Sequence, residues 1–285
     1  MGSRMKKVVL LAILALTATA FAQFGPRNGR ANGFGGPQNG APTGGNCVLG
    51  GYRGSGLEDS STARKVDRSG FVYARLRYHP YDFWQGRTRE VPWHHDYPDG
   101  DTMLPDALGR LTGVYTTPES FQIVDIDSKE LFKYPFVYLS EPGFLNLLPA
   151  DEKNLREYLD RGGFLFIDDF RGNAVDNSEM ENLIVQLKKL YPTRDLVPLP
   201  ASHPIFHAFF DVDPTTMLPP YRMYNSGDPQ FLGMSDDKDR LQIMVNFNYD
   251  ASEYWQTLDV GLCSIRESGT AVQLGVNLVV YSMTH

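Results

Sequence analysis

Cysteine is scarce in this sequence. The 285 residues include only Cys47 and Cys263. Two thiols are too few to form a metal cluster without other ligands. They could form a disulfide in an oxidising compartment, but Cys47 lies in a segment that we expect to be flexible, so the sequence leaves this pairing open.

The chain also lacks an excess of basic residues. Its 27 Lys and Arg residues are outnumbered by 34 Asp and Glu residues, and the formal net charge is -7. Because no basic patch stands out, this composition argues against nucleic acid as the main partner. After the N-terminal segment, no apolar run is long enough to span a bilayer, so we expect no transmembrane segment in the mature chain.

The N-terminal segment has the features of a secretory signal peptide over residues 1–22. A short apolar run follows two lysines, and Ala20 and Ala22 form a small-residue cleavage site before Gln23. The alternative is a permanent membrane anchor, but the apolar run is short for a spanning helix. Cleavage removes three basic residues and no acidic one, which takes the charge from -7 to -10. We therefore expect an exported protein, either periplasmic or secreted.

Two compositions divide the rest of the chain. Residues 23–65 are rich in Gly, Pro and Asn and predict a disordered linker, whereas residues 66–285 predict one α/β domain. The expected strands are 71–78, 121–126, 134–140, 164–168, 196–199 and 241–249. The expected helices lie around 104–111, 150–163 and 178–192, with helix favoured over strand for 270–285. Ser178 and Glu181 are spaced for a capping box.

Alternating strands and helices with apolar runs such as "FLFI" predict a mostly parallel sheet with helices on both faces. Ligands bind such sheets beyond the carboxyl ends of the strands. The loops "SEPG" (140–143) and "DDFRGN" (168–173) would lie there. We expect Asp168 and Asp169 to lie outside the core, where their strand ends. Because side chains alternate along a strand, one aspartate should face "SEPG" and the other should face a helix N-terminus or loop amides.

Several stretches resemble an uncharacterised bacterial family of exported proteins, the domain of unknown function 4159. They are "YPFVYLSEPG", "YLDRGGFLFIDDF", "HPIFHAFF" and "LGVNLVVYSMTH". The resemblance implies a layered sheet similar to flavodoxin and to class I glutamine amidotransferases. It implies no activity, because none is established for the family as a whole.

The amidotransferase comparison also implies what the chain cannot do. Those enzymes carry a cysteine nucleophile on the turn that corresponds to the residues after "FLFID". Here that turn offers Asp168, Asp169, Phe170 and Arg171. A thiolate is the group that this chemistry needs, and Cys263 is far along the chain. We therefore predict that the protein is not a glutaminase.

Three polar groups are candidate ligand-binding sites. Glu141, Asp168 and Asp169, with Arg171 beside them, could bind a cation or act as acid and base, although caps and loop contacts explain such residues too. His203 and His207 in "HPIFH" have the spacing of helical metal ligands, but Pro204 favours a structural role. The third group is "WHHDYPDGD", which contains Trp93, His94, His95, Asp96, Asp99 and Asp101. It could supply metal ligands or be a polar loop.

Two aromatic groups suit a sugar or peptide ligand, since flat apolar rings lie beside amides and carboxylates in the sequence. The alternative is that the rings close the core. The first group is Tyr78, Tyr81, Phe83, Trp84, Trp93 and Tyr97, and the second is Asn246, Asn248, Asp250, Tyr254 and Trp255.

Two functions follow from these residues. The first is a non-catalytic, exported domain that binds a ligand or protein, or acts as a scaffold, in the cell envelope. The second is a metal- or carboxylate-dependent hydrolase acting on an envelope glycan or peptide. The sequence predicts no cofactor and does not identify the envelope protein or glycan that would be the partner.

The signal peptide leads to a direct test. Mass spectrometry of the native protein should find a mature chain that begins at or near Gln23, outside the cytoplasm. A cytoplasmic protein with an intact N-terminus would contradict this prediction.

Overall fold

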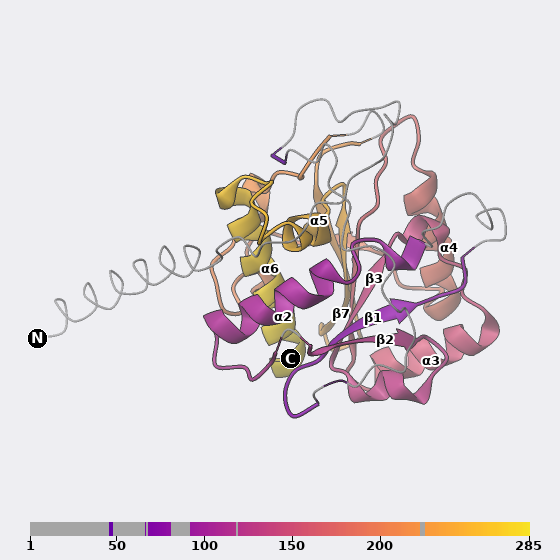
Figure 1. Cartoon of the computed structure of the whole chain (residues 1–285). Coiled ribbons are helices and arrows are strands. Elements are labelled where there is room, and N and C mark those ends of the chain that lie inside the picture. The colour runs from indigo at the N-terminus through magenta and orange to yellow at the C-terminus, as the bar shows by residue number, and fades with distance from the viewer. Residues whose placement is uncertain (1–45, 48–65, 67, 81–91, 118, 223–225) are drawn as a thin grey trace, which may run out of the picture.

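The computed structural model describes residues 46–47, 66, 68–80, 92–117, 119–222 and 226–285. The predicted signal peptide and most of the predicted linker lie outside these residues. A seven-stranded sheet with the order β2-β1-β3-β4-β7-β6-β5 forms the centre (Figure 1). Its strands are β1 (Tyr73–Arg77), β2 (Phe121–Asp125), β3 (Phe136–Ser140), β4 (Phe164–Asp168), β5 (Val197–Pro198), β6 (Gln230–Ser235) and β7 (Leu241–Phe247). The first four strands and β7 are parallel, whereas β6 is antiparallel to β7 and β5 is antiparallel to β6.

Helices cover both faces of this sheet. The α-helices are α2 (Asp99–Leu111), α3 (Pro149–Asp160), α4 (Ser178–Leu190), α5 (Ala251–Gln256) and α6 (Ile265–Thr284). Short 3-10 turns occur at η2 (Pro92–His94), η3 (Lys129–Lys133), η4 (Pro142–Phe144), η5 (Pro204–Phe206) and η6 (Pro214–Thr216). Helices α2, α5 and α6 pack together on one face, and α3 and α4 lie on the other (Figure 1). The predicted α/β fold is confirmed, and its layers are those of a flavodoxin-like architecture.

The sequence patterns locate most of the strands and α-helices but miss β6 and α5. Helix α5 has only six residues, and β6 includes Gly233 and shows no strong periodicity. The predicted capping box is wrong: Asn177 occupies the N-cap of α4, and the Ser178 hydroxyl donates to Asp176 at 2.8 Å. The start of α4 therefore depends on the turn before it rather than on Glu181.

A disulfide between Cys47 and Cys263 joins residues that are 216 positions apart. The backbone around it is also paired, since Asn46 N donates to Pro220 O at 2.8 Å and Ser264 N donates to Asn46 O at 2.7 Å. Within the predicted linker, this short segment is thus held against the start of α6. Neither cysteine is left as a free thiol.

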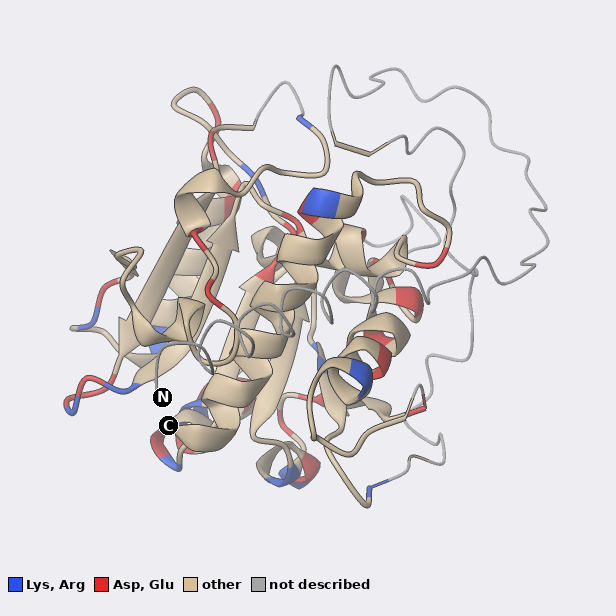
Figure 2. Ribbon diagram, turned by 90° about the vertical axis from the view of Figure 1, so that its left-hand side faces the viewer, with Lys and Arg blue, Asp and Glu red and all other residues tan. Residues whose placement is uncertain are grey.

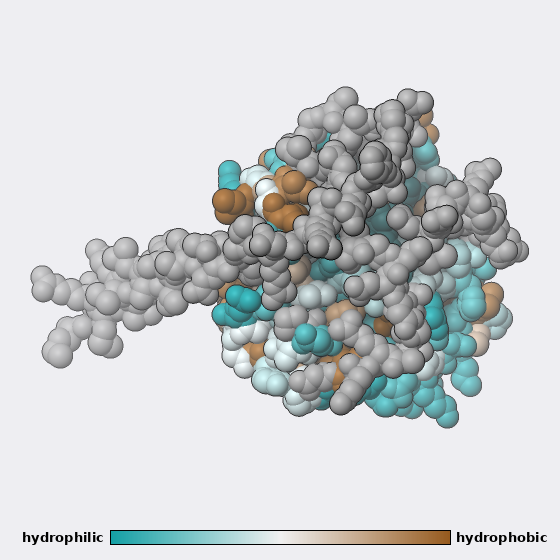
Figure 3. Space-filling model, viewed as in Figure 1, coloured by the Kyte–Doolittle hydropathy of each residue, from teal (hydrophilic) through white to brown (hydrophobic). Residues whose placement is uncertain are grey.

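The surface seen in Figure 3 is largely hydrophilic where the structure describes it. An apolar area near the first turn of α6 includes Val260, 44% exposed, and Ile265, 78% exposed. Single exposed apolar side chains of this kind are common on soluble domains. Among the described helices, none has the length and apolar character needed to cross a membrane.

The disulfide should contribute strongly to stability, because it closes a very long loop in the unfolded chain. The Cys47→Ser, Cys263→Ser double variant should lose about 2–4 kcal/mol of unfolding free energy. Its melting temperature should therefore fall by at least about 4 °C. A reducing agent should lower the parent's melting temperature and leave that of the double variant unchanged. Equal melting of the two oxidised proteins would show that the bond adds nothing to stability.

Candidate functional site

Acidic side chains gather at the carboxyl ends of three neighbouring strands. Glu141 follows β3, Asp168 ends β4 and Asp169 follows it, and Asp250 lies just beyond β7. Because β3, β4 and β7 are parallel neighbours, these ends meet at one edge of the sheet. Figure 2 shows several acidic positions (red) near the ends of strands of the sheet.

Asp168 and Asp169 have separate environments, as side-chain alternation predicts. Asp168 Oδ2 accepts hydrogen bonds from the backbone amides of Ala251 at 2.9 Å and Ser252 at 3.0 Å, at the start of α5. Asp169 turns toward the loop after β3, and Ser140 Oγ donates to its Oδ2 at 3.3 Å. The expectation that both lie outside the core was wrong, because both are fully buried. Loops and α5 cover the end of β4, which the sequence pattern predicted to lie outside the core.

Asp169 is the centre of a three-residue ion cluster. His95 Nδ1 makes a short hydrogen bond to Asp169 Oδ2. On the other side, Arg171 donates to Asp169 Oδ1 at 3.2 Å. The Asp169 side chain is fully buried, whereas those of His95 and Arg171 are 36% and 17% exposed. A buried carboxylate is therefore paired with two cations that reach toward solvent.

Glu141 lies beside this cluster. Its carboxylate oxygen is 3.7 Å from His95 Nδ1, and its side chain is 18% exposed. Its backbone is fixed by the Tyr78 hydroxyl, which donates to Glu141 O at 2.6 Å and to Ser140 O at 3.1 Å. Glu141 is thus a partly accessible acid held next to an imidazole.

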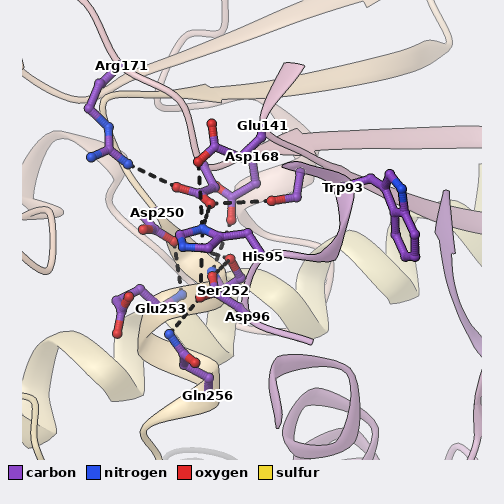
Figure 4. Close-up of polar contacts among 12 residues, drawn as sticks. Trp93, His95, Asp96, Glu141, Asp168, Arg171, Asp250, Ser252, Glu253 and Gln256 are labelled. Carbon is purple, nitrogen blue, oxygen red and sulfur yellow. Dashed lines mark hydrogen bonds and ion pairs between the residues drawn. The ribbon is translucent and has the colours of Figure 1, made fainter. Parts of the chain in front are cut away.

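A second set of polar side chains adjoins the first (Figure 4). Asp96 accepts from Ser252 Oγ at 2.5 Å and from Gln256 Nε2 at 2.7 Å. Asp250 accepts from the Tyr221 hydroxyl at 3.0 Å. The carboxylate oxygens of Asp96, Asp250 and Glu253 lie within 4.8 Å of one another. At this spacing, carboxyl groups must share protons or a cation, because three bare negative charges would repel.

Unusual backbone conformations concentrate at the same edge. Among the described residues other than glycine, five have positive φ, and four of them are Asp96 (62°), Glu141 (52°), Asp169 (59°) and Asn248 (59°). A left-handed conformation costs such residues of order 1–3 kcal/mol and is often found at binding sites. At Asp169 it turns the chain immediately after β4, which separates its side chain from that of Asp168.

The charges at this edge set the protonation of its groups. Burial lowers the pKa of His95, but the charges of Asp169 and Asp96 raise it well above its ordinary value. Burial raises the pKa of Asp169, but the charge of His95 and its hydrogen bond outweigh this and lower it. At neutral pH the two residues therefore form an imidazolium–carboxylate pair.

The pKa values of the surrounding carboxyl groups are raised, in contrast to that of Asp169. Burial, followed by the charge of Asp169, raises the pKa of Glu141 and Asp250 well above the ordinary values. Burial and the charge of Asp169 raise the pKa of Asp168 to about 8, and burial and the charge of Asp96 raise that of Glu253 to about 8. Strongly shifted acids beside an ion pair are typical of functional sites.

This arrangement limits the chemistry of the site. His95, Asp96 and Asp169 each place one possible ligand atom within 4.8 Å of the others, so these residues could hold a metal ion in place of the direct hydrogen bond between His95 and Asp169. Nε2 of His95 has no hydrogen-bond partner among the described residues, and it is the atom that could give a proton to a ligand. The site can therefore bind charged groups and transfer protons.

Several predicted candidates do not join the cluster. His203 Nδ1 accepts from Ile205 N at 3.1 Å and its ring lies 6.1 Å from Tyr281, near the end of α6. His207 pairs with Asp211 at an exposed turn. Trp93 is buried, and its ring points away from the polar cluster (Figure 4). In contrast, Glu141, Asp168, Asp169, Arg171 and Asp96 all meet at the sheet edge.

The described aromatic candidates lie in the core rather than on the surface. All are at most 7% exposed: Tyr78, Trp93, Tyr97, Tyr254 and Trp255. Tyr81, Phe83 and Trp84 lie outside the described residues. For the described rings, core closure is therefore the correct interpretation. His95 and Asp250 were candidates only as members of larger groups, and Ser252 and Glu253 were not predicted; the "NYDAS" turn after β7 was the available signal.

The His95–Asp169 pair should give a characteristic pH dependence. Because the folded pKa of His95 is raised, His95 contributes fully to folding stability below about pH 6.5, and this contribution is lost as the pH rises through the raised pKa. The contribution of Asp169, whose folded pKa is lowered, is present above about pH 4 and is lost as the pH falls. Asp169→Asn should therefore lower the unfolding free energy most between about pH 4 and about pH 6.5, where both groups are charged. The loss should be about 1–3 kcal/mol, given that His95 is partly exposed.

This effect is measured by thermal melting of the parent and of Asp169→Asn at a series of pH values, together with NMR titration of the His95 ring. The pKa of His95 should fall in Asp169→Asn. Glu157→Gln, near the other edge of the sheet, should leave that pKa unchanged. A His95 ring that titrates identically in parent and Asp169→Asn would contradict the pairing.

Comparison with known proteins places the chain in a family but does not assign an activity. No curated protein matches the chain. The family model described as "Domain of unknown function (DUF4159)" matches residues 73–283, from the first residue of β1 to the last turn of α6. The chain therefore belongs to the DUF4159 family.

Proposed function

We propose that this domain binds a ligand or protein partner of the cell envelope at the carboxyl edge of its sheet, without covalent catalysis. The observation that carries the proposal is Asp169, a buried carboxylate fixed between His95 and Arg171 where a catalytic nucleophile would need to be free. The chemistry of the edge favours a ligand with a positively charged group. Among the described residues, five acidic side chains, Asp96, Glu141, Asp169, Asp250 and Glu253, surround two basic ones. Burial and neighbouring negative charge raise the pKa of Glu141 and Asp250, so a cationic ligand would supply the positive charge that lets these groups ionise.

Export to the envelope is part of the same proposal. It rests on the signal-peptide pattern of residues 1–22 and on the disulfide between Cys47 and Cys263. Structural disulfides persist in oxidising compartments and are rare in the cytoplasm. The same bond occupies both thiols of the chain, so we expect no release of ammonia from glutamine.

A second candidate is an acid–base hydrolase acting on an envelope glycan or peptide. The hydrogen bond that His95 Nδ1 donates to Asp169 favours it, because this contact orients the imidazole and leaves Nε2 to act on a ligand. Glu141, 3.7 Å from the imidazole and with a pKa raised by burial and by the charge of Asp169, could orient water or give a proton. This mechanism needs neither a thiol nor a serine nucleophile.

Matched ligands test the binding proposal. The mature chain is titrated calorimetrically with a lysine-containing peptide and its Nε-acetylated form, and with glucosamine and N-acetylglucosamine. We expect at least one amine to bind more tightly than its acetylated counterpart. Glu141→Gln should weaken that binding about tenfold, which corresponds to about 1.4 kcal/mol. Glu157→Gln, a surface acid on α3, is the control and should bind like the parent.

The same samples separate binding from hydrolysis. Mass spectrometry of a bound peptide or glycan should show intact ligand if the domain only binds. Cleavage that is lost in His95→Gln and kept in Glu157→Gln would support the hydrolase instead. Equal binding of free and acetylated amines, or an unaffected Glu141→Gln, would refute a cation-binding edge.

A further inference from the structure

Five polar atoms buried beneath the candidate site have no hydrogen-bond partner within the described structure. They are Tyr73 Oη, Tyr138 Oη, Asp168 Oδ1, Asn246 Oδ1 and Asn246 Nδ2. All four residues are fully buried. An unpaired buried polar group costs about 1–3 kcal/mol, so nearly all such groups in proteins have a partner. Five of them in one layer therefore call for a common explanation.

The four residues occupy one face of four adjacent strands. Tyr138 of β3 is level with Arg75 of β1, and Tyr73 is two residues before Arg75 on the same face. Asp168 of β4 is level with Ser140, two residues beyond Tyr138. The register of β4 with β7 places Asn246 next to Asp168. This face is covered by the layer of α2, α5 and α6.

Other contacts show that these side chains converge. The rings of Tyr73 and Tyr138 are 5.6 Å apart, and the Tyr138 ring is 6.3 Å from Trp255 of α5. Burial, followed by the charge of Asp168, raises the pKa of Tyr138. A side-chain hydrogen bond from Asn246 lowers the pKa of Asp168, although this contact falls short of full hydrogen-bond geometry and leaves Asp168 Oδ1 and both Asn246 amide atoms without a well-aligned partner. The phenols, the amide and the carboxyl group thus lie near one another beneath α5.

The chemistry of this set identifies the ligand class. The two phenols and the Asn246 NH2 are donors, and Asn246 Oδ1 is an acceptor. Asp168 Oδ1 donates when the carboxyl group is protonated and accepts when it is ionised, and its pKa of about 8 makes both forms accessible. A metal ion has no use for the amide hydrogens, and an acidic group such as Asp168 disfavours an anion. Water both donates and accepts, and buried water commonly satisfies such mixed sets. We propose that Tyr73, Tyr138, Asp168 and Asn246 surround a buried site for ordered water, between the sheet and α5.

This water site would support the candidate functional site. Asp168 uses its other oxygen, Oδ2, to bind the amides of Ala251 and Ser252. Water on Oδ1 would therefore hold Asp168, and through it the first turn of α5. That helix carries Ser252, Glu253 and Gln256, so the water acts as a positioning element and not as a reactant.

The direction of a melting-temperature change tests the proposal. If Tyr138 Oη donates to water, Tyr138→Phe removes a hydrogen bond, and the melting temperature should fall by about 2–4 °C. If the hydroxyl is dry and unpaired, the same substitution removes an unsatisfied group, and the melting temperature should rise or stay constant. The ring remains in either case, so its packing on Arg75 and Trp255 is retained.

Tyr158→Phe serves as the matched control. The Tyr158 hydroxyl donates directly to Phe164 O at 3.2 Å, so this variant should melt below the parent. A high-resolution crystal structure of the mature chain provides the second measurement, with density for water expected within hydrogen-bond distance of Asp168 Oδ1. A melting temperature of Tyr138→Phe equal to or above that of the parent would overturn the proposal. A dry space with Asp168 bonded directly to Asn246, or an anomalous signal for a bound cation after rubidium soaking, would do so too.

Discussion

The burial of Arg75 is the constraint around which the functional edge is built. Its guanidinium is fully buried in the middle of β1, where an unpaired charge would be very costly. Asp101 of α2 accepts from it at 2.6 Å and 2.9 Å, which fixes that helix to the sheet. The two hydrogens of Nη1 bind the carbonyls of Trp93 at 3.1 Å and His95 at 2.8 Å. One buried cation therefore positions the loop that presents the His95 imidazole.

Between that loop and the strand ends, side chains of opposite charge alternate. His95 meets Asp169, and Asp169 meets Arg171, so a carboxylate lies between two cations. The adjacent Asp168 would repel Asp169 if both faced the same space. The left-handed turn at Asp169 prevents this, because it directs Asp169 to the imidazole while Asp168 binds the amides of α5. The strain of the turn is offset by the hydrogen bonds that it allows.

The sequence predicted the parts of this architecture that depend on local patterns. Apolar runs located the parallel strands, and alternation along β4 predicted different environments for Asp168 and Asp169. The pairing of His95 with Asp169 joins residues 74 positions apart, and that of Ser252 with Asp96 spans 156 positions. No local periodicity encodes such contacts. The burial of both aspartates was missed for the same reason, since α5, which covers them, has only six residues.

The position of Asp169 supports the proposal that the site binds a ligand and does not attack it as a nucleophile. The family resemblance implied a fold like that of class I glutamine amidotransferases, in which the turn after the equivalent strand presents a reactive thiolate. Here the turn presents a carboxylate whose two oxygens are already engaged by an imidazolium and a guanidinium. Attack on a substrate would require both partners to be displaced, leaving two cations without a counter-charge in a largely buried site. A carboxylate held in this way is better suited to orienting the groups around it, and His95, Arg171 and the nearby Glu141 are the groups through which a ligand would contact this edge.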